Sequence, residues 1–156
     1  PEKRRVWVQQ IADTPKNLRE AVDGLSEEQL LTPYRPDGWT VCQVVHHVAD
    51  SHLNSYIRFR LGLTEDRPLI RTYDQDKWAN LPDATTVRID TSLVLLEALH
   101  IRWVELLDSF TAADFARRLQ HPEWGEISLD TSLQIYAWHG LHHVAQVKSL
   151  RERQGW

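Results

Sequence analysis

The segment Tyr136-Ala-Trp-His-Gly-Leu-His-His-Val-Ala-Gln146 carries two histidines, His139 and His143, four residues apart. The segment belongs to a run that is typical of a helix, and side chains four residues apart share one helical face, with Cβ atoms about 5–6 Å apart. Two imidazoles at this spacing can bind one metal ion with nitrogens roughly 2.0–2.1 Å from it. The alternative is a pair of histidines packed at a hydrated contact between helices. His142 lies about 60° to the other side of His139 and is the poorer partner.

A second histidine cluster, His46-His47-Val-Ala-Asp50-Ser-His52, lies far upstream on another predicted helix. Helical phase directs His47 along the apolar stripe of this helix, whereas His46 falls to one side and His52 is nearly opposite. We therefore expect structural or exposed roles for His46 and His52. If the two helices face each other, they bring three nitrogens to one ion and leave coordination positions open for water.

Helical periodicity dominates the rest of the chain. The first helical region is expected to break at Thr14-Pro15, because a proline after a threonine is typical of a helix start. Thr40 is expected to cap a helix that runs to about Leu61 and ends at Gly62. Two further long helices are predicted over residues 92–109 and 131–153, separated by a segment (118–129) that is compatible with a small hairpin. The sequence therefore predicts an all-α four-helix bundle with short extra helices, folded as a single domain over residues 1–156.

Composition narrows the range of partners. The formal net charge is −4, and the basic residues are scattered among acidic ones, so no concentrated basic face is available for nucleic acid. No apolar run approaches the ~20 residues that a membrane span requires. The only cysteine, Cys42, excludes an internal disulfide and is typical of a protein in a reducing cytoplasm. We therefore expect a cytoplasmic protein that acts on a small-molecule substrate.

Three stretches together resemble the DinB/YfiT-like superfamily, and in particular its YfiT-type branch of metal-dependent hydrolases. They are Gly38-Trp-Thr-Val-Cys-Gln-Val-Val-His-His-Val-Ala-Asp-Ser-His52, Ser55-Tyr-Ile-Arg-Phe59 and Tyr136-Ala-Trp-His-Gly-Leu-His-His-Val-Ala145. The resemblance covers nearly the whole chain.

The resemblance implies a four-helix bundle that holds one divalent metal ion, nickel or zinc, through three histidines. Carried onto this chain, the implied ligands are His47, His139 and His143. Members of the superfamily often form homodimers, so a homodimer is expected. Relatives include bacillithiol-dependent S-transferases.

A three-histidine site leaves positions open on the ion, and two chemistries can use them. Water bound there can become a nucleophile near neutral pH, which is the chemistry of a hydrolase. A low-molecular-weight thiol can instead bind as thiolate, which is the chemistry of a bacillithiol-type S-transferase. The third hypothesis is a non-catalytic dimeric bundle with a structural metal. The histidines do not decide among the three.

Further polar residues follow His47 along its helix. Asp50 comes three residues later and is a candidate to orient a ligand or relay a proton, although a surface or capping carboxylate is an equal alternative. Asn54 and Arg58 continue the stripe and are candidates to bind a polar or anionic substrate. A salt bridge at the rim is the alternative role for Arg58.

Overall fold

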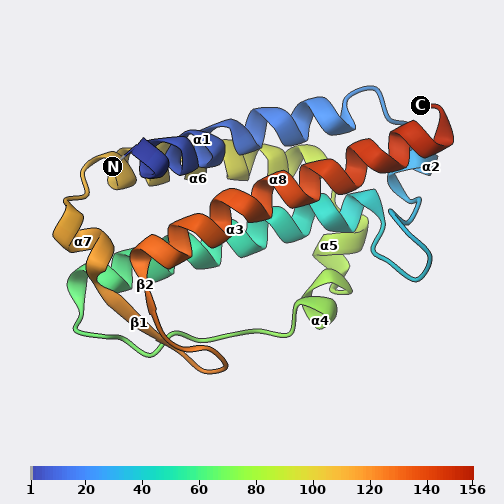
Figure 1. Cartoon of the computed structure of the whole chain (residues 1–156). Helices are drawn as coiled ribbons and strands as arrows, with labels where there is room; N and C mark the ends of the chain where they lie inside the picture. The colour runs from blue at the N-terminus through green and yellow to red at the C-terminus, as the bar shows by residue number, and fades with distance from the viewer. Residues whose placement is uncertain (1) are drawn as a thin grey trace.

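The computed structural model describes residues 2–156, and four long helices make up most of it (Figure 1). They are α1 (Glu2–Val22), α3 (Val41–Thr64), α6 (Ile89–Asp108) and α8 (Leu129–Gln154). Helices α1 and α3 each pack against both α6 and α8, so the four helices form a ring of neighbours. This arrangement confirms the all-α four-helix bundle.

The helices do not alternate in direction along the chain. In Figure 1, α1 and α8 run one way, while α3 and α6 both run the other way. Because α3 and α6 are parallel, the chain between them has to return along the length of the bundle. This return segment, residues 65–88, contains the short helices α4 (Gln75–Ala79) and α5 (Pro82–Thr86), which pack against α3. The return segment therefore covers one side of the bundle.

The expected short elements are present. Helix α2 (Glu27–Leu30) and helix α7 (Ala112–Ala116) are each one turn long. Strands β1 (Arg118–His121) and β2 (Gly125–Ser128) pair antiparallel just before α8, which confirms the small hairpin. Thr40 caps α3 as predicted, because its side chain accepts from the Gln43 backbone N–H while the Gln43 side chain accepts from the Thr40 N–H.

The break predicted at Thr14-Pro15 is wrong, because α1 continues through Pro15. A proline inside a helix cannot donate to the carbonyl four residues earlier, here that of Ile11. That carbonyl instead lies 2.7 Å from Nδ1 of His100 on α6, and the Thr14 hydroxyl donates to the Gln10 carbonyl at 2.9 Å. A side chain from a neighbouring helix thus satisfies the group that the proline leaves free.

The predicted end of α3 at Gly62 is also wrong, because the helix continues to Thr64. A Cβ atom at Gly62 would lie 2.9 Å from Leu129 Cδ2, so glycine is required for close packing rather than for ending the helix. Gly140 on α8 has the same role. A Cβ there would collide with the Thr14 hydroxyl, so this glycine lets α1 approach α8 closely.

The interior is apolar at both ends of the bundle. Two clusters of buried side chains fill it, one around Phe59, Trp103 and Leu133 and the other around Val44, Leu96 and Val147. Several buried polar side chains are histidines, with His52 fully buried and His100 2% exposed. Among residues 2–156, no helix has the length and apolar character needed to cross a membrane.

Candidate metal centre

Three imidazoles meet between α3 and α8. Nε2 of His139 lies 3.3 Å from Nε2 of His47 and 3.2 Å from Nε2 of His143. These are the three residues implied by the resemblance, and their nitrogens all lie within 4.8 Å of one another. His47 comes from α3, while His139 and His143 are one turn apart on α8, so the packing of the two helices creates the cluster.

The spacing of the nitrogens suits one metal ion. Two nitrogens that each lie roughly 2.0–2.1 Å from one ion, at a tetrahedral angle, are about 3.3–3.4 Å apart. The separations of Nε2 of His139 from the other two nitrogens, 3.3 and 3.2 Å, agree with this requirement. The residues present therefore fit a divalent ion held by three imidazoles.

Two hydrogen bonds indicate how His143 is protonated. Its Nδ1 lies 2.8 Å from Oε1 of Gln146, and the amide nitrogen of Gln146 lies 2.9 Å from Nε2 of His142. In this arrangement Nδ1 of His143 donates, and Nε2 keeps a lone pair directed at the cluster. Gln146 thus aligns one candidate ligand from the next turn of α8.

Burial keeps all three imidazoles neutral. It lowers the pKa of His47 to about 3, and His143 adds a smaller effect in the same direction. Burial lowers the pKa of His143 to about 4, although its bond with Gln146 acts against the shift. The pKa of His139 is lowered well below its ordinary value, first by burial and then by His143. Neutral imidazoles with free lone pairs are the form that binds metal.

His46 is oriented away from the cluster. Its Nδ1 lies 2.7 Å from the Ser92 hydroxyl, and its Nε2 lies 3.0 Å from the Val87 carbonyl. Both nitrogens are therefore engaged at the contact of α3 with the start of α6. Of the two adjacent histidines, only His47 presents a nitrogen to His139.

His52 and His100 extend the cluster inward, and sequence reasoning missed them. Nε2 of His52 lies 3.1 Å from Nδ1 of His139, and Nδ1 of His52 lies 2.9 Å from Nε2 of His100. Helical phase does place His52 away from His47, but α3 packs against both α6 and α8, so more than one of its faces is buried. The high histidine count, eight in the chain, was the available signal.

A cavity of about 380 Å³ adjoins the cluster, and the rings of His47, His139 and His143 form part of its wall. The other lining residues come from the segment before α3, from α4 and from α8, and they include Arg35, Trp39, Asp76, Trp138 and His142. Trp39 donates from its indole nitrogen to Asp76 at 3.1 Å, which fixes one wall.

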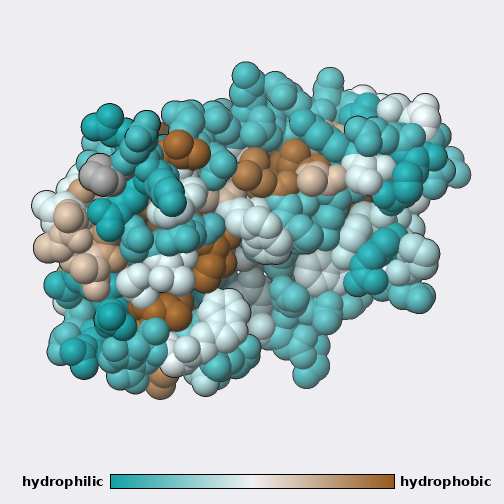
Figure 2. Space-filling view, viewed as in Figure 1, coloured by the Kyte–Doolittle hydropathy of each residue, from teal (hydrophilic) through white to brown (hydrophobic). Residues whose placement is uncertain are grey.

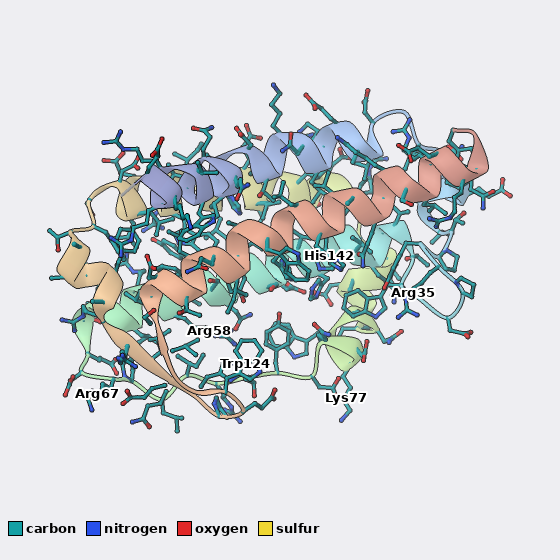
Figure 3. The ribbon with its side chains drawn as sticks, in the orientation of Figure 1. Arg35, Arg58, Arg67, Lys77, Trp124 and His142 are labelled. Carbon is teal, nitrogen blue, oxygen red and sulfur yellow. The ribbon has the colours of Figure 1, made fainter. Side chains whose placement is uncertain are left out.

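Figure 2 shows a hollow near the middle of one face of the molecule, bordered by hydrophilic and intermediate residues and, on its left, by hydrophobic ones. Figure 3 shows His142 under α8 and above α4 in this view, with Arg35 farther toward the C-terminal end of α8. A small polar molecule could therefore reach the three imidazoles from solvent.

The other predicted site residues lie elsewhere on α3. The Asn54 amide donates to the Asp50 carbonyl at 2.9 Å, and Arg58 donates to the Arg71 carbonyl at 2.7 Å. Asp50 is half-buried, and burial, followed by the charge of Asp83, raises the pKa of its carboxyl. None of Asp50, Asn54 and Arg58 lines the cavity beside the cluster. Their functional roles stay predictions.

Ser51 and Tyr136 lie nearer to the imidazoles. The Ser51 hydroxyl is 3.5 Å from Nε2 of His139 and 3.4 Å from the Tyr136 hydroxyl. Ser51 follows His47 by four residues and Tyr136 precedes His139 by three, so each shares a helical face with a candidate ligand, and this spacing was the available signal. Their hydroxyls add polar groups beside the nitrogens.

Known proteins resemble this chain over almost its full length. The DinB superfamily model matches residues 10–147. A Bacillus mycoides protein named "Putative metal-dependent hydrolase" is 53% identical over 150 residues, which cover 96% of this chain and 86% of that protein. A Bacillus cereus protein of the same name matches with the same identity and coverage.

Two solved structures share the fold. One is described as "YfiT from Bacillus subtilis is a probable metal-dependent hydrolase with an unusual four-helix bundle topology". It is 46% identical and superposes with a TM-score of 0.97 over 100% of this chain and 90% of that one. TT2238, a four-helix bundle protein, matches with a TM-score of 0.63 and 19% identity over 89% of this chain and 93% of that one, which supports the fold alone. The chain therefore belongs to the DinB superfamily.

Proposed function

We propose that this protein is a metal-dependent hydrolase that binds one divalent ion, nickel or zinc, through Nε2 of His47, His139 and His143. The observation that carries the proposal is the convergence of three neutral imidazole nitrogens at a cavity, with Nε2 of His139 3.2 and 3.3 Å from the other two. The names of the Bacillus relatives support the metal dependence and the reaction class. When bound, such an ion acts as a Lewis acid and generates a water nucleophile near neutral pH.

The residues around the ion have separate tasks in this proposal. His47, His139 and His143 stay unprotonated at neutral pH because burial lowers the pKa of each ring. Gln146 holds the ring of His143 through a 2.8 Å hydrogen bond. The Ser51 hydroxyl, 3.5 Å from Nε2 of His139, can donate to a polar group of a substrate held beside the ion.

The cavity favours an enzyme over a structural metal site. A structural zinc ion is usually closed by four protein ligands, whereas a catalytic ion keeps a position for water or substrate. Among residues 2–156, the group of potential ligands at this place has three members, and about 380 Å³ of space adjoins them. The cavity is large enough for a small molecule.

Metal binding is tested by elemental analysis and by titration of the metal-free protein with zinc or nickel. We expect about one ion per chain. His139→Ala should weaken binding by more than the ~10–100-fold that loss of a supporting group costs, since it removes a ligand itself. His46→Gln is the matched control, because both nitrogens of this histidine face Ser92 and Val87, away from the cluster. Equal affinity in His139→Ala and wild type would disprove the site.

The reaction class is tested with two assays on the metal-loaded protein. Activated esters and amides report hydrolysis, and the coupling of cysteine to an electrophilic dye reports thiol transfer. Ester or amide hydrolysis that disappears on chelation and returns with zinc or nickel would support the proposal. Metal-dependent coupling without hydrolysis would replace it with the S-transferase alternative.

A further inference from the structure

A chain of hydrogen bonds crosses the bundle and ends at the candidate ligand His139. It begins at the Ile11 carbonyl on α1, which lies 2.7 Å from Nδ1 of His100 on α6. Nε2 of His100 lies 2.9 Å from Nδ1 of His52 on α3. Nε2 of His52 then lies 3.1 Å from Nδ1 of His139 on α8. All four long helices therefore contribute one member.

Pro15 creates the first member of this chain. In a regular helix the N–H of residue 15 would donate to the carbonyl of Ile11, but a proline has no N–H. The carbonyl oxygen is thus free to accept a hydrogen bond from a side chain, and Nδ1 of His100 is the donor. His100 is 2% exposed, so its hydrogen bonds are made to protein groups in a dry interior.

The carbonyl determines where each proton lies. A carbonyl oxygen only accepts, so Nδ1 of His100 must carry the proton, and Nε2 of the same neutral ring must accept. It accepts from Nδ1 of His52, which leaves Nε2 of His52 as the acceptor for Nδ1 of His139. His139 therefore carries its proton on Nδ1, and its Nε2 is a bare lone pair directed at His47 and His143.

We propose that His52 and His100 are positioning residues that hold His139 in the Nδ1–H tautomer, so that its Nε2 is permanently available to a metal ion. This inference rests on the proposed metal site. An imidazole with its proton on Nε2 cannot bind an ion through that atom, so the tautomer decides whether His139 is a ligand. In general, the group that hydrogen-bonds the other ring nitrogen of a metal-binding histidine sets the orientation and basicity of that ring.

The Ile11 carbonyl, which fixes the tautomer of His139 through the two rings, differs from the group that fixes His143. Gln146 holds His143 through a side-chain amide, which can rotate and exchange its acceptor oxygen for its donor nitrogen. The Ile11 carbonyl is part of the backbone and cannot exchange roles. Each ring between it and His139 must also carry a single proton, and both rings are buried between hydrogen-bond partners with no charged side chain among them.

Two substitutions at His52 separate positioning from packing. His52→Gln keeps an amide oxygen near the place of Nε2, so the acceptor for His139 is retained. His52→Leu fills a similar volume without an acceptor and leaves Nδ1–H of His139 unsatisfied. Zinc affinity is measured by competition with a coloured chelator. We expect a ~10–100-fold loss in His52→Leu and a smaller loss in His52→Gln.

Tautomers are read independently of metal. Long-range proton–nitrogen NMR correlations of the metal-free protein distinguish Nδ1–H from Nε2–H rings, and His139→Ala identifies the signals of His139. We expect His139, His52 and His100 to be Nδ1–H in the wild type. The same state should persist for His139 in His52→Gln and be lost in His52→Leu.

The outcomes are distinct. An Nε2–H ring at His139 in the wild type overturns the inference even if zinc binds. Wild-type zinc affinity in a folded His52→Leu variant also overturns it. If His52→Leu does not fold, the wild-type tautomers and the affinity of His52→Gln still decide. Failure of the wild type to bind zinc would overturn the metal site, while the NMR signals would separately report whether the hydrogen-bond chain exists.

Discussion

Acidification of the metal-free protein from pH 7 to pH 5 should lower its free energy of unfolding sharply. His47, His100 and His143 are buried, and burial is the main cause that lowers their pKa values, to about 3, 4 and 4 respectively. In the unfolded chain each ring has a pKa near 6.5. Between pH 6.5 and 4 the unfolded chain therefore binds more protons than the folded protein. Stability is present above pH 6.5 and is lost as the pH falls toward the folded pKa values.

The size of the effect follows from the same values. At pH 5 an unfolded imidazole lies about 1.5 pH units below its pKa, which corresponds to ~2 kcal/mol for each ring that stays neutral in the folded state. Three rings give ~6 kcal/mol, which is comparable with the ~5–15 kcal/mol total stability of a typical domain. Metal-free protein should thus be close to unfolding at pH 5.

Urea unfolding followed by circular dichroism at pH 7, 6 and 5 measures the change. His143→Gln provides the control, because it removes one titrating ring while keeping a polar side chain of similar size. Its loss of stability between pH 7 and pH 5 should be smaller than that of the wild type by ~2 kcal/mol. A wild-type change below ~1 kcal/mol over this interval would refute the claim that these rings are buried and neutral.

The other predictions concern helix packing, helix capping and metal binding. Gly140→Ala should destabilise the fold by ~1–3 kcal/mol, because the new methyl group meets Thr14, and Thr14→Ala in the same chain should restore part of the loss in thermal unfolding. Thr40→Ala should cost ~1 kcal/mol of unfolding free energy by removing the cap of α3. His46→Gln should leave zinc affinity within the error of a chelator competition, since both nitrogens of His46 face the start of α6. Zinc at 100 times its dissociation constant should raise the free energy of unfolding by ~2.7 kcal/mol at pH 7.

The bundle was predictable because its helices carry strong local signals. The capping box of Thr40 and Gln43 marks the start of α3, and it forms in the structure as the sequence indicates. Pro15 and Gly62 misled the prediction, since each has an ordinary meaning as a helix boundary. Here a histidine from another helix compensates for Pro15, and close packing against Leu129 requires Gly62. Such tertiary reasons are invisible in the local sequence.

The candidate site was also predictable only in part. His139 and His143 are four residues apart, so their proximity follows from helix geometry, and helical phase chose His47 over His46. The contacts of His52 and His100 depend on how α3, α6 and α8 surround one another, which no spacing in one helix reveals. The cavity beside Trp39 likewise depends on α4, which the return segment brings against α3.

The residues of the cluster are far apart in sequence, and this separation determines when the site can form during biosynthesis. His47 and His139 are 92 residues apart in sequence, on helices α3 and α8. A ribosome that has released α1, α3 and α6 has therefore made just one member of the cluster. Capture of an ion by three imidazoles therefore has to wait until α8 has emerged and docked against α3.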